Sequence, residues 1–203
     1  MPAKRIAPAI AVLCSGQGTN LQAILDAVRA GRLKARVAVV VSDNAGAYAL
    51  ARAKRAKVPA VVMDRRRFRS RREFDRALAR ILVAARVRLV VLAGFMRVLS
   101  PAFVRRFRWR ILNIHPALLP SFPGVRGVRD ALRHGVKVTG VTVHFVDAQV
   151  DHGPILLQEA VAVRDGETES QLLARIHRVE HRLYPKAIQQ VLDQKGSGRP
   201  GTS

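Results

Sequence analysis

Short apolar runs alternate with helical patterns along the first half of the chain, and this alternation constrains the fold more than any other feature of the sequence. Four apolar runs are expected to be buried strands, at residues 9–14, 36–42, 59–63 and 88–93. Helical patterns lie between them, at residues 21–30, 47–57 and 71–85. The sequence therefore predicts an α/β fold with a doubly wound, mostly parallel twisted sheet and right-handed crossovers.

The second half of the chain follows a different pattern. Residues 139–146 alternate and residues 155–163 form a further run, so we expect these segments to add an antiparallel pair to the sheet. An amphipathic pattern from Glu169 to about Asp193 predicts a long C-terminal helix, and residues 196–203 read as a flexible tail. At 203 residues the chain is long enough for one domain, which we place at residues 1–195.

Composition limits the classes of function. No apolar run is long enough to span a membrane, and the single Cys14 cannot form an internal disulfide, so we expect a cytoplasmic protein without a membrane partner. The net charge is +22, and its densest run is Arg65–Arg72. This charge keeps a basic nucleic-acid-binding module open as an alternative. Because aromatic residues make up only 5% of the chain and no nucleic-acid motif is present, we expect no specific nucleic-acid partner.

The apolar segment 111–115 is the candidate catalytic strand. Asn113 and His115 are two residues apart, so their side chains share one face of a strand. Pro116 cannot extend a central strand because it has no N–H, which leaves the pair at the carboxyl end, where open α/β sheets bind ligands. An amide and an imidazole suit the stabilisation of an oxyanion that forms when a nucleophile adds to a carbonyl. The competing interpretation is a turn cap beside an ordinary hydrogen-bonded histidine.

A glycine-containing turn, residues 15–20, separates the first strand from the first helix. This arrangement aims backbone N–H groups and the positive end of a helix at an anion such as phosphate. The turn matches neither the dinucleotide-binding pattern nor the P-loop pattern. The residues alone leave a phosphate site and a plain tight turn equally open.

Several dispersed motifs occur together in one order: Ala93-Gly94-Phe95-Met96-Arg97, Asn113-Ile114-His115-Pro116, Leu118-Leu119-Pro120 and Val150-Asp151-His152-Gly153-Pro154. With them the chain resembles the formyltransferases that use 10-formyltetrahydrofolate, over nearly its whole length. The resemblance implies a Rossmann-like formyltransferase fold, with a nucleotide-binding half at about 9–108 and a catalytic, folate-binding half at about 109–195. It also implies two small-molecule substrates and no metal. The implied reaction moves a formyl group from 10-formyltetrahydrofolate to the amine of glycinamide ribonucleotide in purine synthesis.

The resemblance also assigns residues. It implies that Asn113, His115 and Asp151 are catalytic, with Asp151 raising the pKa of His115 so that the imidazole stays protonated near neutrality. The ribonucleotide would be bound by Gly18, Thr19, Asn20 and Glu180. The folate would be bound by Arg71, Met96, Arg97, Val98, Leu99, Asn113 and Asp147.

Some features depart from this pattern or compete with it. Val128 stands where members of the family often have a histidine, next to a Pro- and Gly-rich loop at residues 116–127 that we expect to be a mobile flap. His177, Glu180 and His181 match the H-x-x-E-H pattern of zinc peptidases, but we discount zinc because no third ligand is evident. Within the resemblance, the alternatives are a formyltetrahydrofolate deformylase and a methionyl-tRNA formyltransferase-like enzyme, and the chain length argues against both.

The sequence predicts a monomer or a homodimer. It leaves the role of the Arg65–Arg72 run open.

Overall fold

The structure, a computed structural model, describes residues 7–194. Its elements follow the chain in the order β1 (Ala9–Cys14), α1 (Thr19–Arg29), β2 (Arg36–Ser42), α2 (Tyr48–Arg55), β3 (Ala60–Val62), the 3-10 helix η1 (Arg65–Arg67), α3 (Arg71–Ala84), β4 (Leu89–Leu92), α4 (Pro101–Arg106), β5 (Ile111–His115), α5 (Gly127–His134), β6 (Val138–Phe145), β7 (Ile155–Ala162) and α6 (Glu169–Asp193). In this part of the chain no helix combines the length and the apolar character that crossing a bilayer requires.

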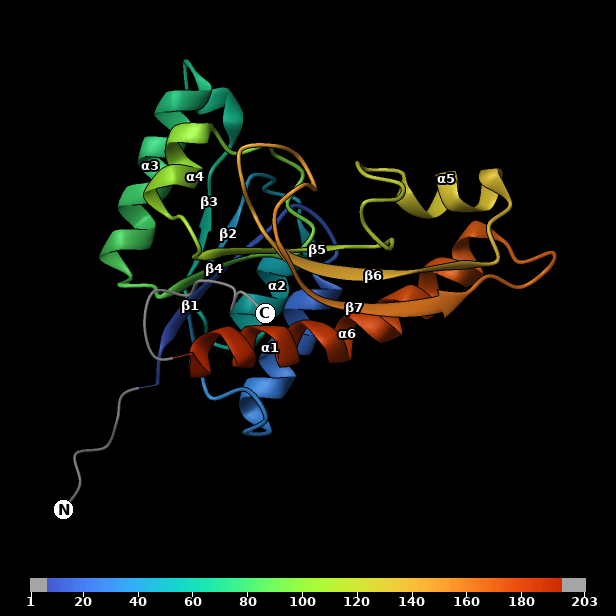
Figure 1. The fold of residues 1–203 in the computed structure, drawn as a ribbon. Helices are drawn as coiled ribbons and strands as arrows, with labels where there is room; N and C mark the ends of the chain where they lie inside the picture. Colours follow the sequence, from blue (N-terminus) through green and yellow to red (C-terminus); the bar gives the residue numbers. More distant parts are fainter. Residues whose placement is uncertain (1–6, 195–203) are drawn as a thin grey trace.

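The strands form one sheet in the order β3-β2-β1-β4-β5-β6-β7. Strands β1 to β5 pair in parallel, whereas β6 is antiparallel to both β5 and β7. The predicted α/β class, the parallel sheet and the antiparallel addition are therefore confirmed. The carboxyl ends of β1 to β5 all lie along one edge of the sheet, and the segments that follow these strands gather there (Figure 1).

Two apolar layers cover the sheet, because successive side chains of a buried strand point to opposite faces. Ile10 and Val12 of β1 pack with the helices α1, α2 and α6, whereas Ala11 and Leu13 pack with α3 and α4. Residues of β6, such as Val143, belong only to the first layer. Figure 1 shows α3 and α4 on one side of the sheet and α1 and α6 on the other. On the α3 side, the β5–β6 part of the sheet is thus left to loops rather than helices.

The structure differs from the sequence-based expectation at two helices. Helix α1 begins at Thr19, two residues earlier than predicted, with Gly18 as its N-cap at φ 68°. Helix α5 (Gly127–His134) was not predicted, so the irregular loop ends at residue 126. Helix α5 has only eight residues, half of them polar, and it is held by packing against α6. The expected tail at residues 196–203 lies outside the described residues.

Candidate active site

The carboxyl end of β5 carries the predicted catalytic pair. Leu112 and Ile114 pack toward α6, so Asn113 and His115 face the opposite side of the sheet. Strand β6 lies beside β5, and the antiparallel register places His144 directly opposite Asn113. The pair therefore projects into the region that loops, rather than helices, cover.

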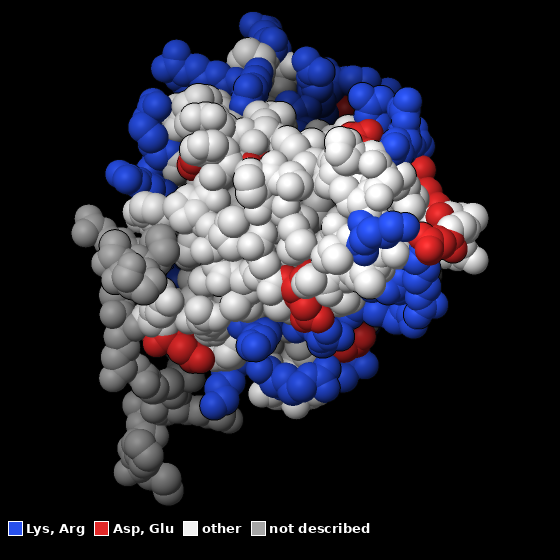
Figure 2. Space-filling view, turned by 45° about the vertical axis from the view of Figure 1, so that its right-hand side comes forward, with Lys and Arg blue, Asp and Glu red and all other residues white. Residues whose placement is uncertain are grey.

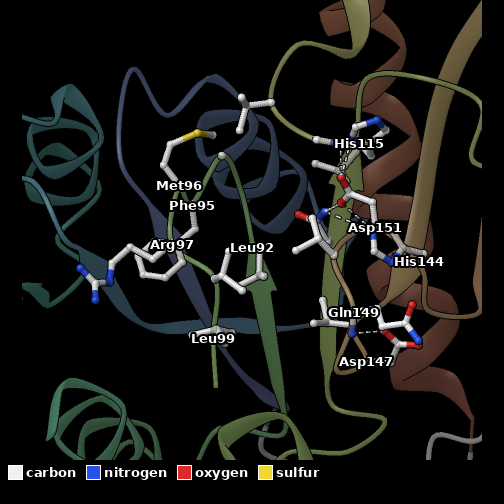
Figure 3. A pocket seen from close by; sticks show the side chains of 18 of the residues that line it. Leu92, Phe95, Met96, Arg97, Leu99, His115, His144, Asp147, Gln149 and Asp151 are labelled. Carbon is white, nitrogen blue, oxygen red and sulfur yellow. Dashed lines mark hydrogen bonds and ion pairs between the residues drawn. The ribbon is translucent and has the colours of Figure 1, made fainter. Parts of the chain in front are cut away.

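Asp151, from the loop between β6 and β7, completes this cluster. Its Oδ2 lies 3.4 Å from Nδ1 of His115, and its Oδ1 lies 3.3 Å from Nδ2 of Asn113. Gly153 allows the loop to approach the strand end, because a Cβ at this position would lie 1.9 Å from the carbonyl oxygen of Phe145. The structure thus brings together the three residues proposed as catalytic, and Figure 3 shows Asp151 pointing between His115 and His144.

The imidazole of His115 is almost fully buried and lies between two acceptors. Nδ1 faces the Asp151 carboxylate, and Nε2 lies 2.8 Å from the carbonyl oxygen of Phe122. Burial lowers the pKa of His115, and this effect outweighs the attraction of Asp151 and the bond to Phe122, which both raise it. The expectation that Asp151 keeps His115 protonated near neutrality is therefore wrong for this arrangement, because desolvation of the imidazolium is the larger effect.

The carboxyl group of Asp151 has a pKa below its ordinary value. Burial raises the pKa, but His144 in its protonated form, the hydrogen bond from the Gly124 N–H and His115 in its protonated form together lower it by a larger amount. The Gly124 N–H donates to Oδ2 of Asp151 at 2.8 Å. The cluster therefore holds a carboxylate beside a histidine that is neutral at rest.

His144 fixes the orientation of Asn113. Nδ1 of His144 lies 2.9 Å from the carbonyl oxygen of Phe145, which only accepts, so Nδ1 carries the proton. In the neutral imidazole Nε2 is then an acceptor, and Nδ2 of Asn113 donates to it at 3.1 Å. The second N–H of the amide is directed at Asp151. Both donors of Asn113 are thus engaged, and a substrate oxygen can receive one only by replacing His144 or Asp151.

The loop 116–126 covers the cluster from outside. It is fixed at its start, where the Thr142 hydroxyl donates to the Ala117 carbonyl at 2.7 Å and accepts from the Leu119 N–H at 3.0 Å. Phe122 and Gly124 then contact the catalytic pair as described. Val128, the second residue of α5, is buried in the core. Position 128 therefore contributes packing to this site rather than a titratable group.

A cavity of about 230 Å³ opens beside the cluster. On one side it is lined by the segment 94–99 that follows β4, and on the other by Asn113, His115 and the segment 146–151. Met96 and Val98 are largely exposed at 65% and 57%, whereas Leu99 is buried. The wall is mainly apolar with polar groups at one end, as expected for a ring system whose reactive atom must meet the cluster.

Three further predicted folate-binding residues, Arg71, Arg97 and Asp147, lie in or beside the cavity wall. Arg71 of α3 donates a hydrogen bond to the carbonyl oxygen of Leu99 and so fixes the 94–99 segment. The guanidinium of Arg97 lies 4.1 Å above the ring of Phe74. Asp147 lines the cavity and accepts from His152 Nδ1 at 2.8 Å. Arg71, Arg97 and Asp147 therefore all reach the rim or the wall of one cavity.

The turn after β1 forms an open helix N-terminus. The first backbone bond in α1 runs from the Gln22 N–H to the Gly18 carbonyl, so the N–H groups of Thr19 and Asn20 have no partner within the helix. Gly18 is required by its positive φ and by the close approach of α2, since a Cβ would lie 2.6 Å from the Cβ of Ala49. This geometry favours the phosphate-site interpretation over a plain turn.

Glu180 meets this helix end from α6. Nδ2 of Asn20 donates to its Oε2 at 2.8 Å, across 160 residues of sequence. Burial raises the pKa of Glu180 to about 7, and the bond from Asn20 only partly opposes this effect. One turn further along α6, the Tyr184 hydroxyl contacts the carbonyl oxygens of Leu92 and Leu112 at 2.8 and 3.0 Å. This part of α6 is thereby held against the carboxyl end of β4 and the first half of β5.

The H-x-x-E-H segment does not form a metal centre. The rings of His177 and His181 stack with centroids 6.0 Å apart, and the Glu180 carboxylate is directed at Asn20. Within residues 7–194 no three His, Cys, Asp or Glu side chains are placed to hold a metal ion. His181 Nε2 is buried without a hydrogen-bond partner among the described residues, close to Arg52.

Two contributors were not predicted from the sequence. His144 was not predicted as a site residue. The alternating pattern of its strand shows on which face of the sheet its side chain lies, but it does not show that Asn113 is the residue opposite. Arg52 of α2 donates to the Gln17 carbonyl at 2.8 Å and so brings a cation to the turn that precedes α1. In the sequence, Arg52 was distinguished only as one of several basic residues in the predicted helix 47–57.

The comparisons with known proteins agree with this geometry. The model of the family described as Formyl transferase matches residues 9–188. Phosphoribosylglycinamide formyltransferase of Escherichia coli (strain K12) is 44% identical over 179 residues, which are 88% of this chain and 84% of that protein. The crystal structure of glycinamide ribonucleotide transformylase 1 from Symbiobacterium toebii superimposes with a TM-score of 0.90 at 56% identity, covering 92% of this chain and 88% of that one.

Some longer proteins contain a similar sequence as one part. The trifunctional purine biosynthetic protein adenosine-3 of Gallus gallus is 47% identical over 182 residues, or 90% of this chain. The chain spans only 18% of the length of that relative.

Proposed function

Because the chain belongs to the formyl transferase family, we propose that it transfers the formyl group of 10-formyltetrahydrofolate to the primary amine of glycinamide ribonucleotide in purine biosynthesis. The main structural support is that Asn113, His115 and Asp151 converge at the end of a mainly apolar cavity. The reacting formyl group belongs at that end, with the folate ring system in the cavity. Arg71, Met96, Arg97, Val98, Leu99, Asn113 and Asp147 are proposed to contact the folate.

The ribonucleotide is proposed to bind across the open N-terminus of α1. Its phosphate accepts from the N–H groups of Gly18, Thr19 and Asn20, and the helix dipole adds to this attraction. Glu180 contacts the amine end of the substrate. A positive charge or an N–H donor at this point favours the ionised carboxylate, which opposes the effect of burial on its pKa.

In the proposed reaction the amine nitrogen bonds to the formyl carbon, the bond from that carbon to N10 breaks, and a proton moves from the amine to N10. His115 is neutral at the outset, so it can take the proton that the amine loses on attack. Because Nε2 already donates to the Phe122 carbonyl, the proton is taken up by Nδ1, where the Asp151 carboxylate stabilises the imidazolium. This N–H, shared between Asp151 and the substrate, donates to the oxyanion and afterwards supplies the proton to N10.

Protonation of His115 also changes the hydrogen bonding of Asn113. Once Asp151 pairs with a charged His115, its hold on the Asn113 amide weakens, and this 3.3 Å bond is already the longer of the two. One N–H is thereby released to the oxyanion, while His144 keeps the other. The cluster thus acquires its oxyanion donors as the negative charge develops.

The decisive experiment is an assay for formylated product with purified protein, glycinamide ribonucleotide and 10-formyltetrahydrofolate. We expect stoichiometric formation of tetrahydrofolate and formylated ribonucleotide. Folate hydrolysis without the amine would instead identify a deformylase, and formylation of methionyl-tRNA would identify the other family alternative. An absence of all three activities would refute the proposal.

A further inference from the structure

Ser15 stands where the two proposed substrate sites diverge. It follows β1, whose neighbours in the sheet are β2 and β4. The turn 15–20 leads from β1 into α1 on one face of the sheet, whereas the segment 94–99 leads from β4 toward α4 on the other face (Figure 1). Such a divergence opens a crevice between the carboxyl ends of the two strands. The turn carries the proposed phosphate site, and the segment forms the proposed folate wall.

The hydrogen bonds of Ser15 hold these two segments together. Its backbone N–H donates to the Gly94 carbonyl at 3.0 Å, and its hydroxyl oxygen accepts from the Met96 N–H at 2.9 Å. Among the described residues, the bond to Met96 is the one side-chain hydrogen bond between the turn 15–20 and the segment 94–99. Ser15 is therefore the direct link between the two proposed sites.

Asp43, which follows β2, orients the Ser15 hydroxyl. The Met96 N–H only donates, so the hydroxyl proton is directed at Oδ1 of Asp43, 2.6 Å away. This is the short distance expected for a hydroxyl bonded to a carboxylate. Figure 2 shows Lys and Arg side chains set closely along the border of this molecule of net charge +22. Even so, Asp43 has no ion-pair partner within residues 7–194, and its charge acts on Ser15 instead.

The rest of the turn is braced against α2. The Gly16 carbonyl accepts from the Ala49 N–H at 3.1 Å, and the Gln17 carbonyl accepts from Arg52 at 2.8 Å. The open N–H groups at residues 18–20 thus lie at one end of a short, fixed turn and Ser15 at the other. A ligand that orders the first end also restricts the second.

We propose that Ser15 is a positioning residue that couples the two substrate sites. A phosphate on the turn 15–20 fixes Ser15, and Ser15 fixes the Met96 N–H and with it the folate wall. The inference rests on the proposed function. The substrate that binds first orders both segments, so the second substrate binds to a site that is already ordered and binds more tightly. Linkage requires the same factor in both directions.

Calorimetry with glycinamide ribonucleotide and the unreactive analogue 5,8-dideazafolate measures this coupling. Saturation of the wild type with the ribonucleotide should lower the Kd of the analogue about fivefold, and the reverse titration should give the same factor. In Ser15→Ala the factor should fall below about twofold, because the hydroxyl that links the segments is absent. An unchanged factor in Ser15→Ala would overturn the inference.

Hydrogen exchange of the Met96 amide is a second readout, and it needs no folate. The ribonucleotide alone should slow this exchange in the wild type and leave it unchanged in Ser15→Ala, because the amide responds to the phosphate site through the hydroxyl. Equal slowing in both proteins would show that the ordering bypasses Ser15 and would refute the proposed link.

Two further variants separate coupling from stability. Asp43→Ala keeps Ser15 and removes only the acceptor of its proton, so it tests the same link if Ser15→Ala folds poorly, and the coupling factor should again fall. Thr168→Ala is the matched control, because its hydroxyl also accepts a backbone N–H, from Gln171 at 3.3 Å, but it lies outside both segments. It should lose stability and keep the coupling. Equal loss of coupling in the control would overturn the inference.

The same titrations distinguish the two levels of inference. Coupled binding of the ribonucleotide and the analogue, without turnover of the formyl donor, would refute the proposed function and support the role of Ser15. Turnover with independent binding of the two ligands in the wild type would overturn the coupling alone.

Discussion

Replacing Glu180 by Gln tests how strongly the protein opposes a buried charge. The side chain is 4% exposed, and its one hydrogen bond is accepted from Asn20, which the Gln oxygen can also accept. The pKa is about 7 rather than 4.5, and each pH unit of difference corresponds to about 1.4 kcal/mol. Ionised Glu180 therefore destabilises the folded protein by about 3 kcal/mol.

The sign of the pH dependence follows from proton counting. Between pH 4.5 and about 7 the folded protein retains a proton that the unfolded chain has released. The stability of the wild type therefore falls as pH rises through this window. Glu180→Gln should be nearly neutral near pH 4.5 and more stable than the wild type by about 3 kcal/mol above pH 7, or about 10 °C in Tm.

Urea denaturation between pH 4.5 and pH 8.5 measures this difference directly. Glu169→Gln, at an exposed position in the first turn of α6, is the matched control and should change stability by less than about 1 kcal/mol with little pH dependence. A stability difference for Glu180→Gln that stays constant across the pH range would refute the reasoning, because only a titrating buried carboxyl produces the predicted slope.

Four further predictions concern the catalytic cluster and its supports. Asp151→Asn should lower kcat by about 100-fold or more with little change in either KM, and NMR should show a lower His115 pKa because the attraction that raises it is gone; an unchanged pKa with near-normal turnover would remove Asp151 from the mechanism. His144→Phe should lower kcat by about 10- to 100-fold, with partial recovery in His144→Gln, whose oxygen can accept from Asn113; equal activity of the two variants would contradict the orienting role. Gly153→Ala should destabilise the fold by about 2–4 kcal/mol in urea denaturation, because its Cβ meets the Phe145 carbonyl; a smaller loss than about 1 kcal/mol would show that the loop can move aside. Turnover should be unaffected by chelators, and loss of activity that zinc restores would revive a metal role for His177 and His181.

The sequence by itself determined the elements and the faces of the strands. Alternation along the chain predicted the parallel sheet, and the two-residue spacing predicted that Asn113 and His115 point the same way, because both properties depend on local backbone geometry. The sequence pattern predicted neither the start of α1 at Thr19 nor the presence of α5. Their limits depend on the approach of Ala49 to Gly18 and on packing of α5 against α6.

Only the tertiary structure decided which side chains contact one another and which of the titratable groups are charged. The contact of Asn20 with Glu180 and the register of His144 with Asn113 join segments far apart in sequence, and no local pattern encodes such a pairing. The charge of His115 was misjudged for a related reason. Its neighbour Asp151 could be inferred from the motif, but the depth of burial could not, and desolvation in the folded core outweighs the carboxylate because water no longer solvates the imidazolium.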